Sequence, residues 1–345
     1  MRIAVHGASG FTGRLTVAEV LRRGLTPVLV GRDEDRLRKA AAEAGADGAD
    51  IRVASLDELT GALRGCDAVI NCAGPFTLLG EPVVRAAIAA GAHYVDTTGE
   101  QRYIGRVLDG FWEDARRAGV SVVPAMADDG GPGDMIAHLT AARLGVVDEM
   151  VVADLRHPAG GSRGTARSMA AVFAEGPLEY EDGAWRTAAP PPDAGPPRAS
   201  GGPVSLAVPG EPGQAPVSVF ALPGVVTVPR HVRARRVRSV IRSEVAAMFS
   251  SLTPDVVDAV PETVDPQTRS ASRWLMLAEA TGPDGRRSRG WVTGSDGYGT
   301  TAVIAVEGAR RLVADGAPAG TLTPAQAFDP ESFLNHLGVT WQVLG

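Results

Sequence analysis

The chain has 345 residues with 40 acidic and 34 basic side chains, which gives a formal net charge of -6. This mild acidity argues against a nucleic-acid-binding protein, and two cysteines are too few for a secreted disulfide scaffold of this length. No apolar segment has the pattern of a secretory signal or a membrane span, so we expect a cytoplasmic protein with neither membrane nor nucleic-acid partners.

Short apolar runs alternate with amphipathic segments in the first part of the chain. The runs predict strands at residues 2–6, 27–30, 51–54, 68–71, 93–96 and 120–123. The amphipathic segments predict helices at residues 12–23, 33–43, 56–63, 82–89 and 104–117. Strands separated by helices of this length predict an α/β fold, a doubly wound parallel Rossmann sheet, over residues 1–128.

The pattern changes after residue 128, where we expect an α+β substrate or catalytic domain over residues 129–296. Strands are predicted near residue 151 and at 225–241, 273–280 and 290–294, with a hairpin turned at 181–183 and helices at 165–175 and 244–251. Residues 188–216 are rich in Pro and Gly and predict a surface loop without regular structure. Residues 297–345 predict a helical segment that completes the fold, with helices at 301–315 and 323–327.

A glycine-rich segment, residues 7–13, joins the first predicted strand to the first predicted helix, which is the context of a dinucleotide-binding loop. Gly7 permits the tight turn, Gly10 a close approach of backbone to pyrophosphate, and Gly13 close packing of helix on sheet. The first helical turn then offers N–H groups to the phosphates. The expected cofactor contacts are Gly7, Ser9, Gly10, Phe11 and Thr12. The alternative is a turn that binds nothing.

Arg32 follows the second strand, where dinucleotide folds place the group that contacts the adenine ribose. A guanidinium there favours the 2′-phosphate, so the expected cofactor is NADP(H). Asp33 is the complication, because a carboxylate at the ribose would favour NAD. We favour the alternative that Asp33 caps the next helix.

Polar and small residues follow the fourth and fifth strands, at the edge where open parallel sheets bind ligands. We expect further cofactor contacts from Cys72, Ala73, Gly74, Pro75, Thr97 and Gly99, and substrate contacts from Phe76 and Glu100. Cys72 is better explained as a packed thiol than as a nucleophile. Helix capping is an equal alternative for residues 98–100.

Taken together, residues 7–13, 31–32, 71–76 and 91–100 resemble the saccharopine dehydrogenase-like reductase family, which includes trans-acting enoyl reductases. The resemblance continues at 297–302 and 320–325. Residues 127–134 depart from the family pattern, because Asp128 stands where an aromatic residue is usual. The resemblance implies a site between two domains and hydride transfer between a nicotinamide and a C=N, C=C or C=O bond.

Lys39 is the single lysine, and no tyrosine is followed by lysine four residues later, so the proton relay of short-chain dehydrogenases is absent. The candidate catalytic residues are Asp129 and Asp134, after the sixth strand, and Tyr298. Asp134 is as readily explained as an early-helix carboxylate, and Tyr298 as a turn residue. His138 lies one helical turn beyond Asp134, although a packed or solvent-facing histidine is the simpler interpretation.

Two basic features remain. Arg163, in a Gly-rich segment before a helix, is a candidate substrate contact, with a flexible loop as the alternative. The arginines between residues 230 and 242 suggest a charged strand face or a docking patch for an acidic carrier. No metal-ligand spacing is present. We expect an NADP(H)-dependent oxidoreductase of a small or carrier-bound metabolite, in a homodimer; the alternative is a non-catalytic dinucleotide-binding sensor or scaffold.

Overall fold

The computed structural model describes residues 1–188 and 205–345. The chain divides into two compact units. The first unit comprises Met1–Thr98, Tyr103–Asp128 and Tyr298–Phe328, and the second comprises Gly99–Arg102, Asp129–Gly297 and Asp329–Gly345. The C-terminal segment therefore contributes residues to both units.

A seven-stranded parallel sheet forms the centre of the first unit, in the order β15-β6-β5-β4-β1-β2-β3. Its strands are β1 (Arg2–His6), β2 (Thr26–Gly31), β3 (Asp50–Val53), β4 (Ala68–Asn71), β5 (His93–Asp96), β6 (Ser121–Val123) and β15 (Gly320–Thr321). This order confirms the predicted doubly wound sheet. The seventh strand, β15, was not predicted; it is two residues long, too short to give an alternation pattern.

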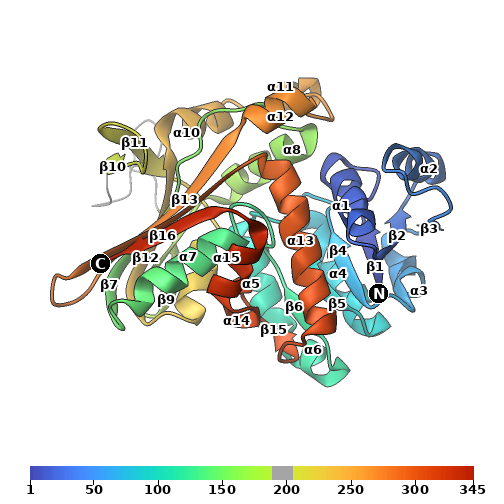
Figure 1. The fold of residues 1–345 in the computed structure, drawn as a ribbon, viewed down its shortest axis with the longest axis horizontal. Helices are drawn as coiled ribbons and strands as arrows, with labels where there is room; N and C mark the ends of the chain where they lie inside the picture. Colours follow the sequence, from blue (N-terminus) through green and yellow to red (C-terminus); the bar gives the residue numbers. More distant parts are fainter. Residues whose placement is uncertain (189–204) are drawn as a thin grey trace. The chain divides into compact units, whose positions relative to one another are not determined.

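The helices of the first unit are α1 (Phe11–Arg22), α2 (Glu34–Glu43), α3 (Leu59–Leu63), α4 (Phe76–Ala90), α5 (Gln101–Gly110), α6 (Trp112–Ala118), α13 (Gly297–Ala314) and α14 (Pro324–Ala327). α1 and α2 pack on the β1–β3 side of the sheet, α4 packs on β4 and β5, and α6 on β6 and β15 (Figure 1). The prediction of a single helix at residues 104–117 is wrong, because the helix is interrupted at Phe111, between α5 and α6. α4 begins at Phe76, before the predicted start at residue 82. Pro82 lies inside the helix and does not mark its first turn.

The long helix α13 lies beside α1 (Figure 1). Glu307 on α13 is fully buried and pairs with Arg23 at the end of α1. Its carboxylate also accepts hydrogen bonds from Arg311 Nε at 2.6 Å and Arg310 Nη2 at 3.0 Å. Three arginines thus share one buried carboxylate, which joins the C-terminal helix to the first helix of the sheet.

A mixed nine-stranded sheet forms the second unit, with the main order β10-β11-β12-β7-β13-β14-β16. The strands are β7 (Val147–Asp154), β8 (Leu178–Glu181), β9 (Ala184–Thr187), β10 (Ser205–Ala207), β11 (Gln214–Val219), β12 (Ala234–Arg242), β13 (Arg273–Thr281), β14 (Arg287–Ser295) and β16 (Thr340–Leu344). β12 and β7 are parallel, and the other pairs are antiparallel. The mixed sheet with helices confirms the predicted α+β class.

The helices of the second unit are α7 (Gly131–Ala142), α8 (Arg163–Glu175), α9 (Gly224–Thr227), α10 (Ser243–Ser250), α11 (Pro254–Ala259), α12 (Pro266–Ala271) and α15 (Pro330–Leu337), with the 3-10 helix η2 (Val228–Arg230). α7 packs on β13 and β14, and α15 packs on α7. The hairpin β8–β9 turns at Asp182 and Gly183, which both have positive φ, as that turn requires.

Two predictions for the second unit are wrong in part. Of the predicted loop 188–216, residues 189–204 lie outside the described residues, but β10 pairs with the start of β11. Leu206 and Ala215 are buried there in one apolar cluster. The alternation of buried and exposed side chains therefore forms strands in a segment whose Pro- and Gly-rich composition predicts a loop. The first part of the segment predicted as strands at 225–241 forms the helices α9 and η2. Val225, Val226 and Val228 are β-branched, and β-branched residues favour strands, but here they are buried in helical turns.

Within the described residues, none of the helices combines the length and the apolarity that crossing a bilayer requires.

Candidate functional site

The loop between β1 and α1 has little room for side chains. Gly7 has φ +76°, and a Cβ on it would lie 2.9 Å from the Cβ of Ala73. A Cβ on Gly13 would lie 2.1 Å from the carbonyl oxygen of Gly7, which real structures do not allow. The turn off the strand and the close approach of α1 therefore both need glycine.

Helix α1 begins directly after this loop. Gly10 is its N-cap and, among the described residues, no side chain caps the helix start. The half-buried ring of Phe11 packs edge-on against Tyr298, with ring centroids 4.9 Å apart. Ser9 and Thr12 are also half-buried. Among the described residues, the N–H groups of the first turn of α1 thus have no side-chain cap, as an anion site at a helix start requires, and the candidate catalytic Tyr298 lies beside this turn in the first unit.

The two candidate ribose-contacting residues, Arg32 and Asp33, both follow the end of β2 but have different environments. Asp33 accepts a hydrogen bond from the backbone N–H of Arg36 at 3.0 Å and is the N-cap of α2. Arg32 is exposed, immediately after the strand. The carboxylate therefore has a structural role, as the favoured interpretation of Asp33 requires.

The loops after β1 and β4 meet where the sheet order reverses. β1 lies between β4 and β2, so the loops that carry Gly7 and Ala73 follow the strands at the switch point, where open α/β sheets bind ligands. The Gly74–Pro75 peptide bond is cis. The loop residues Cys72, Ala73 and Pro75 are half-buried and Gly74 is exposed. The structure thus brings the predicted cofactor residues of two strand ends together.

The thiol of Cys72 is not activated. Although the residue as a whole is half-buried, burial of its sulfur raises the pKa to about 12. Burial also raises the pKa of the Cys66 thiol. We expect iodoacetamide at pH 8 to leave both cysteines unmodified in the folded protein and to alkylate both in urea, as measured by mass spectrometry. Rapid alkylation of Cys72 in the folded protein would contradict this environment.

The segment after β5 meets the segment after β6. A Cβ on Gly99 would lie 2.6 Å from Oδ2 of Asp129, so the candidate catalytic carboxylate lies against the Gly99 backbone. Thr97 is half-buried, and its N–H donates to the carbonyl of Asn71. Glu100, a candidate substrate contact, has only 1% of its surface exposed and lies within the second unit.

Asp134 belongs to a chain of three hydrogen-bonded side chains in the second unit. The residue is 1% exposed, and its Oδ1 lies 2.8 Å from Nε2 of His231. The Nδ1 of His231 lies 3.1 Å from the Nδ1 of His138. Burial, followed by the nearby His231, lowers the pKa of His138. The sequence indicated Asp134 by its position after the sixth strand and His138 by its helical spacing from Asp134, but gave no indication of His231, which is 97 residues from Asp134.

Two candidate substrate contacts, Phe76 and Arg163, have contacts within the protein. Phe76 is 4% exposed and packs against the ring of Tyr103, with centroids 5.7 Å apart. Arg163 donates from Nε to the carbonyl of Val260 at 2.9 Å and lies 3.6 Å from Glu262, so it fixes the start of α8.

The basic run on β12 is largely paired with acidic side chains. Arg235 donates to Asp148 at 2.6 Å, and Arg242 contacts Glu211 at 2.5 Å. Arg238 is 4% exposed and lies 3.5 Å from Glu149. These contacts favour the charged strand face over the docking patch.

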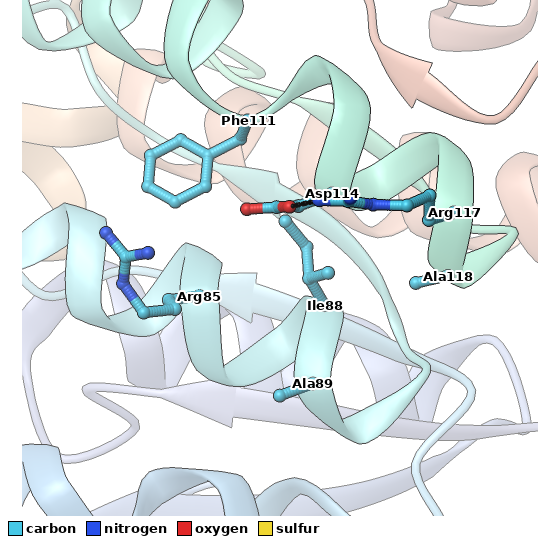
Figure 2. A pocket seen from close by; sticks show the side chains of 7 residues that line it. All are labelled: Arg85, Ile88, Ala89, Phe111, Asp114, Arg117 and Ala118. Carbon is cyan, nitrogen blue, oxygen red and sulfur yellow. Dashed lines mark hydrogen bonds and ion pairs between the residues drawn. The ribbon is translucent and has the colours of Figure 1, made fainter.

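A pocket of about 370 Å³ opens between α4 and α6 (Figure 2). Its lining residues are Arg85, Ile88, Ala89, Phe111, Asp114, Arg117 and Ala118. They come from the C-terminal half of α4, from Phe111 at the N-cap of α6, and from α6, which leads into the start of β6. The pocket is therefore at the edge of the sheet opposite the glycine-rich loop, and it is not the dinucleotide site.

Comparison with known proteins agrees with this geometry. Residues 3–126 match the family model of the saccharopine dehydrogenase NADP-binding domain. The chain is 29% identical over 210 residues to a human saccharopine dehydrogenase-like oxidoreductase, covering 54% of this chain and 44% of the relative. It is 31% identical over 140 residues to a trans-acting enoyl reductase of Mycobacterium bovis, covering 39% of this chain and 34% of the relative. The aligned part thus spans less than half of each relative's own length.

A solved structure of apo saccharopine dehydrogenase from Saccharomyces cerevisiae matches the whole fold. The TM-score is 0.61 at 14% identity, over 100% of both chains. At that identity the likeness supports the fold alone. Residues 3–126 thus match the saccharopine dehydrogenase NADP-binding domain, and the described part of the chain has the fold of saccharopine dehydrogenase.

Proposed function

We propose that this protein is an NADP(H)-dependent oxidoreductase that transfers hydride to an imine or an activated C=C or C=O bond of a small or carrier-bound metabolite. The observation that carries the proposal is the glycine-rich loop at the switch point of the sheet, where Gly13 leaves no space for a side chain and α1 has no side-chain cap. The names of the relatives, an oxidoreductase and an enoyl reductase, support the reaction class.

The residues present fit the cofactor. The N–H groups at the start of α1 would hold the pyrophosphate, and Ser9 and Thr12 would add hydroxyl donors. Arg32 would hold the 2′-phosphate, because Asp33 is engaged as a helix cap. When bound, the nicotinamide supplies the hydride, and the chain supplies orientation and electrostatics.

The proton that accompanies the hydride needs a donor from this chain or from water. Asp129 and the Asp134–His231–His138 chain are the candidates in the second unit, and Tyr298 is the candidate beside the loop. Of these, the histidine chain offers a defined path, because an imidazole that donates from Nε2 to Asp134 can accept at Nδ1 from His138.

The function is tested by following NADPH absorbance with a panel of imines and enoyl thioesters. We expect oxidation with at least one of these acceptors, and much slower oxidation with the Gly13→Ala variant at the same NADPH concentration. Tight NADPH binding without oxidation of any acceptor would overturn the proposed reaction and favour a dinucleotide-binding sensor or scaffold.

The preference for NADP(H) has its own test. Replacing Arg32 with alanine removes one charge-assisted contact, so the Kd for NADPH should rise by about 10- to 100-fold. The Kd for NADH should stay within about threefold, because NADH has no 2′-phosphate. Isothermal titration calorimetry measures both values. An equal loss for the two nucleotides would contradict the role given to Arg32.

A further inference from the structure

Three buried oxygen atoms form a closed triangle beneath the carboxyl end of β5. The Oδ2 of Asp96 lies within hydrogen-bonding distance of the hydroxyl oxygens of Tyr94 and Tyr103, each at 3.0 Å, and the two hydroxyl oxygens are 2.9 Å apart. All three residues are fully buried. Tyr94 and Asp96 share one face of β5, and Tyr103 comes from α5, where Gly80 of α4 leaves space for its ring.

The number of protons on this triangle decides how many of its three oxygen–oxygen contacts can be hydrogen bonds. With Asp96 ionised, two hydroxyl protons serve three oxygen–oxygen contacts, and one contact has no proton. A neutral carboxyl group supplies the third proton, so that each oxygen donates once around the ring. The geometry therefore favours a proton on Asp96, as does its burial in a region where a charge is costly.

The titratable groups that face the Asp96 carboxyl are Tyr94, Tyr103 and Cys72. Burial raises the pKa of all three, so they remain neutral. Burial also raises the pKa of Asp96 to about 6, although hydrogen bonds from the backbone N–H groups of Ala125 and Thr98, and then from the hydroxyls of Tyr103 and Tyr94, oppose this increase. His6 reaches the triangle only through Asn71, and burial lowers its pKa.

The triangle is connected to the ends of four adjacent strands. The amide of Asn71, at the end of β4, donates to Tyr94 at 3.1 Å and accepts from the Ala73 N–H at 3.0 Å and from His6 Nδ1 at 2.9 Å. On the other side, Asp96 Oδ1 accepts from the N–H of Ala125 at 2.9 Å. Ala125, after β6, has φ +63°, a left-handed conformation that a non-glycine residue adopts only when its surroundings hold it there.

These contacts run along the sheet edge that carries the loops of the dinucleotide site. Ala73 lies against Gly7 of the glycine-rich loop, so the bond from its N–H to Asn71 holds the loop after β4 beside that loop. Single hydrogen bonds thus connect the triangle to the loops after β4 and β6.

We propose that Asp96, Tyr94 and Tyr103 are positioning residues of the dinucleotide site and that one shared proton on their oxygen triangle sets the geometry of the loops after β4 and β6. The protonated triangle holds these loops in their binding arrangement, and its ionisation weakens cofactor binding. This inference rests on the proposed function, because it assumes that the dinucleotide binds at this edge.

The experiment compares wild type with Asp96→Asn, whose amide keeps the acceptor for Ala125 and donates to the tyrosines at every pH. The Kd for NADP⁺ is measured by calorimetry between pH 5 and 7.5. The ratio of wild-type to Asp96→Asn Kd cancels the titration of the ligand phosphate and of His6. We expect a ratio near 1 at pH 5 that rises to about 5 at pH 7.5. A ratio that stays constant across this range would overturn the proposal.

Two further variants separate positioning from packing. Tyr103→Phe keeps the ring contact with Phe76 but removes one corner of the triangle, so we expect it to shift the midpoint of the pH dependence. Tyr180→Phe, on β8 of the second unit, is the matched control and should bind NADP⁺ as wild type does at every pH. An unshifted midpoint in Tyr103→Phe would contradict the triangle.

A measurement without nucleotide distinguishes this proposal from the proposed function. A folded-state pKa above the unfolded value means that the proton stabilises the folded protein below pH 4, and that this stability is lost as the pH rises through about 6. The unfolding free energy of wild type should therefore fall relative to Asp96→Asn over that window. If it does and NADP⁺ does not bind wild type, the proposed function fails while the proton site stands; if it does not, the proton site is refuted.

Discussion

Gly13→Ala is expected to raise the Kd for NADPH by about 100-fold or more. The added Cβ would lie 2.1 Å from the carbonyl oxygen of Gly7 and 2.8 Å from the Cα of Ala8. Both contacts are with backbone, so the start of α1 must move away from the loop. The N–H groups of its first turn then no longer converge on the phosphates. Fluorescence titration with NADPH measures the change.

The matched control is Gly61→Ala, in the short helix α3. A Cβ at Gly61 meets no atom within 4 Å, and the residue is helical with ordinary φ. Alanine there should leave NADPH affinity unchanged and slightly stabilise the helix. If Gly13→Ala binds NADPH as tightly as Gly61→Ala does, the loop is not the phosphate site.

Glu307→Gln is expected to lower the free energy of unfolding by about 3–5 kcal/mol. The substitution is nearly isosteric and opens no cavity, but it removes the buried negative charge that Arg23, Arg310 and Arg311 all contact. Arg23 keeps a second carboxylate, Glu19 at 2.6 Å, and Arg310 keeps Asp315 at 3.4 Å. Arg23 and Arg311 are themselves mostly buried, with 12% and 13% of their side chains exposed. Urea denaturation followed by circular dichroism measures the loss.

Glu34→Gln provides the comparison with an exposed ion pair. Glu34 pairs with Arg38 on the surface of α2, where 54% and 66% of the two side chains are exposed. Solvent screens this pair, so its loss should cost several times less than the loss of Glu307. Equal effects of the two substitutions would show that the buried cluster does not hold α13 on α1.

The parallel sheet could be predicted from the sequence because each buried strand is a short apolar run between turn residues. β1, β4 and β5 begin and end where the pattern placed them. Helices were harder to delimit. Pro82 lies inside α4 without ending it, and Phe111 separates α5 from α6 although the amphipathic pattern continues across it.

The second unit was predicted less well because its contacts join distant parts of the chain. β10 and β11 pair across a stretch whose prolines and glycines suggested a loop, although Leu206 and Ala215 are buried. Gly224 opens a helix where three valines suggested a strand; a Cβ there would lie 3.0 Å from Val152. Where the secondary-structure propensity of a short segment is weak, tertiary contacts of this kind determine whether it forms a helix or a strand.

For the candidate site, spacing found the loops but not the side chains that support them. The glycines at 7 and 13 have the tight environments that the motif requires. The Asp96 triangle was not predicted, although Tyr94 and Asp96 are two residues apart and therefore lie on the same face of a buried strand. Polar residues two apart in an otherwise apolar strand are the signal that points to such a cluster. His231 gave no signal, because its partners are remote in sequence.

The central claim is that the loop at residues 7–13 and Arg32 form an NADP(H) site. The most direct test is calorimetric titration of the wild-type chain with NADPH and with NADH under the same conditions. We predict a single site that binds NADPH at least about tenfold more tightly than NADH. Tighter binding of NADH, or no binding of either nucleotide, would contradict the account.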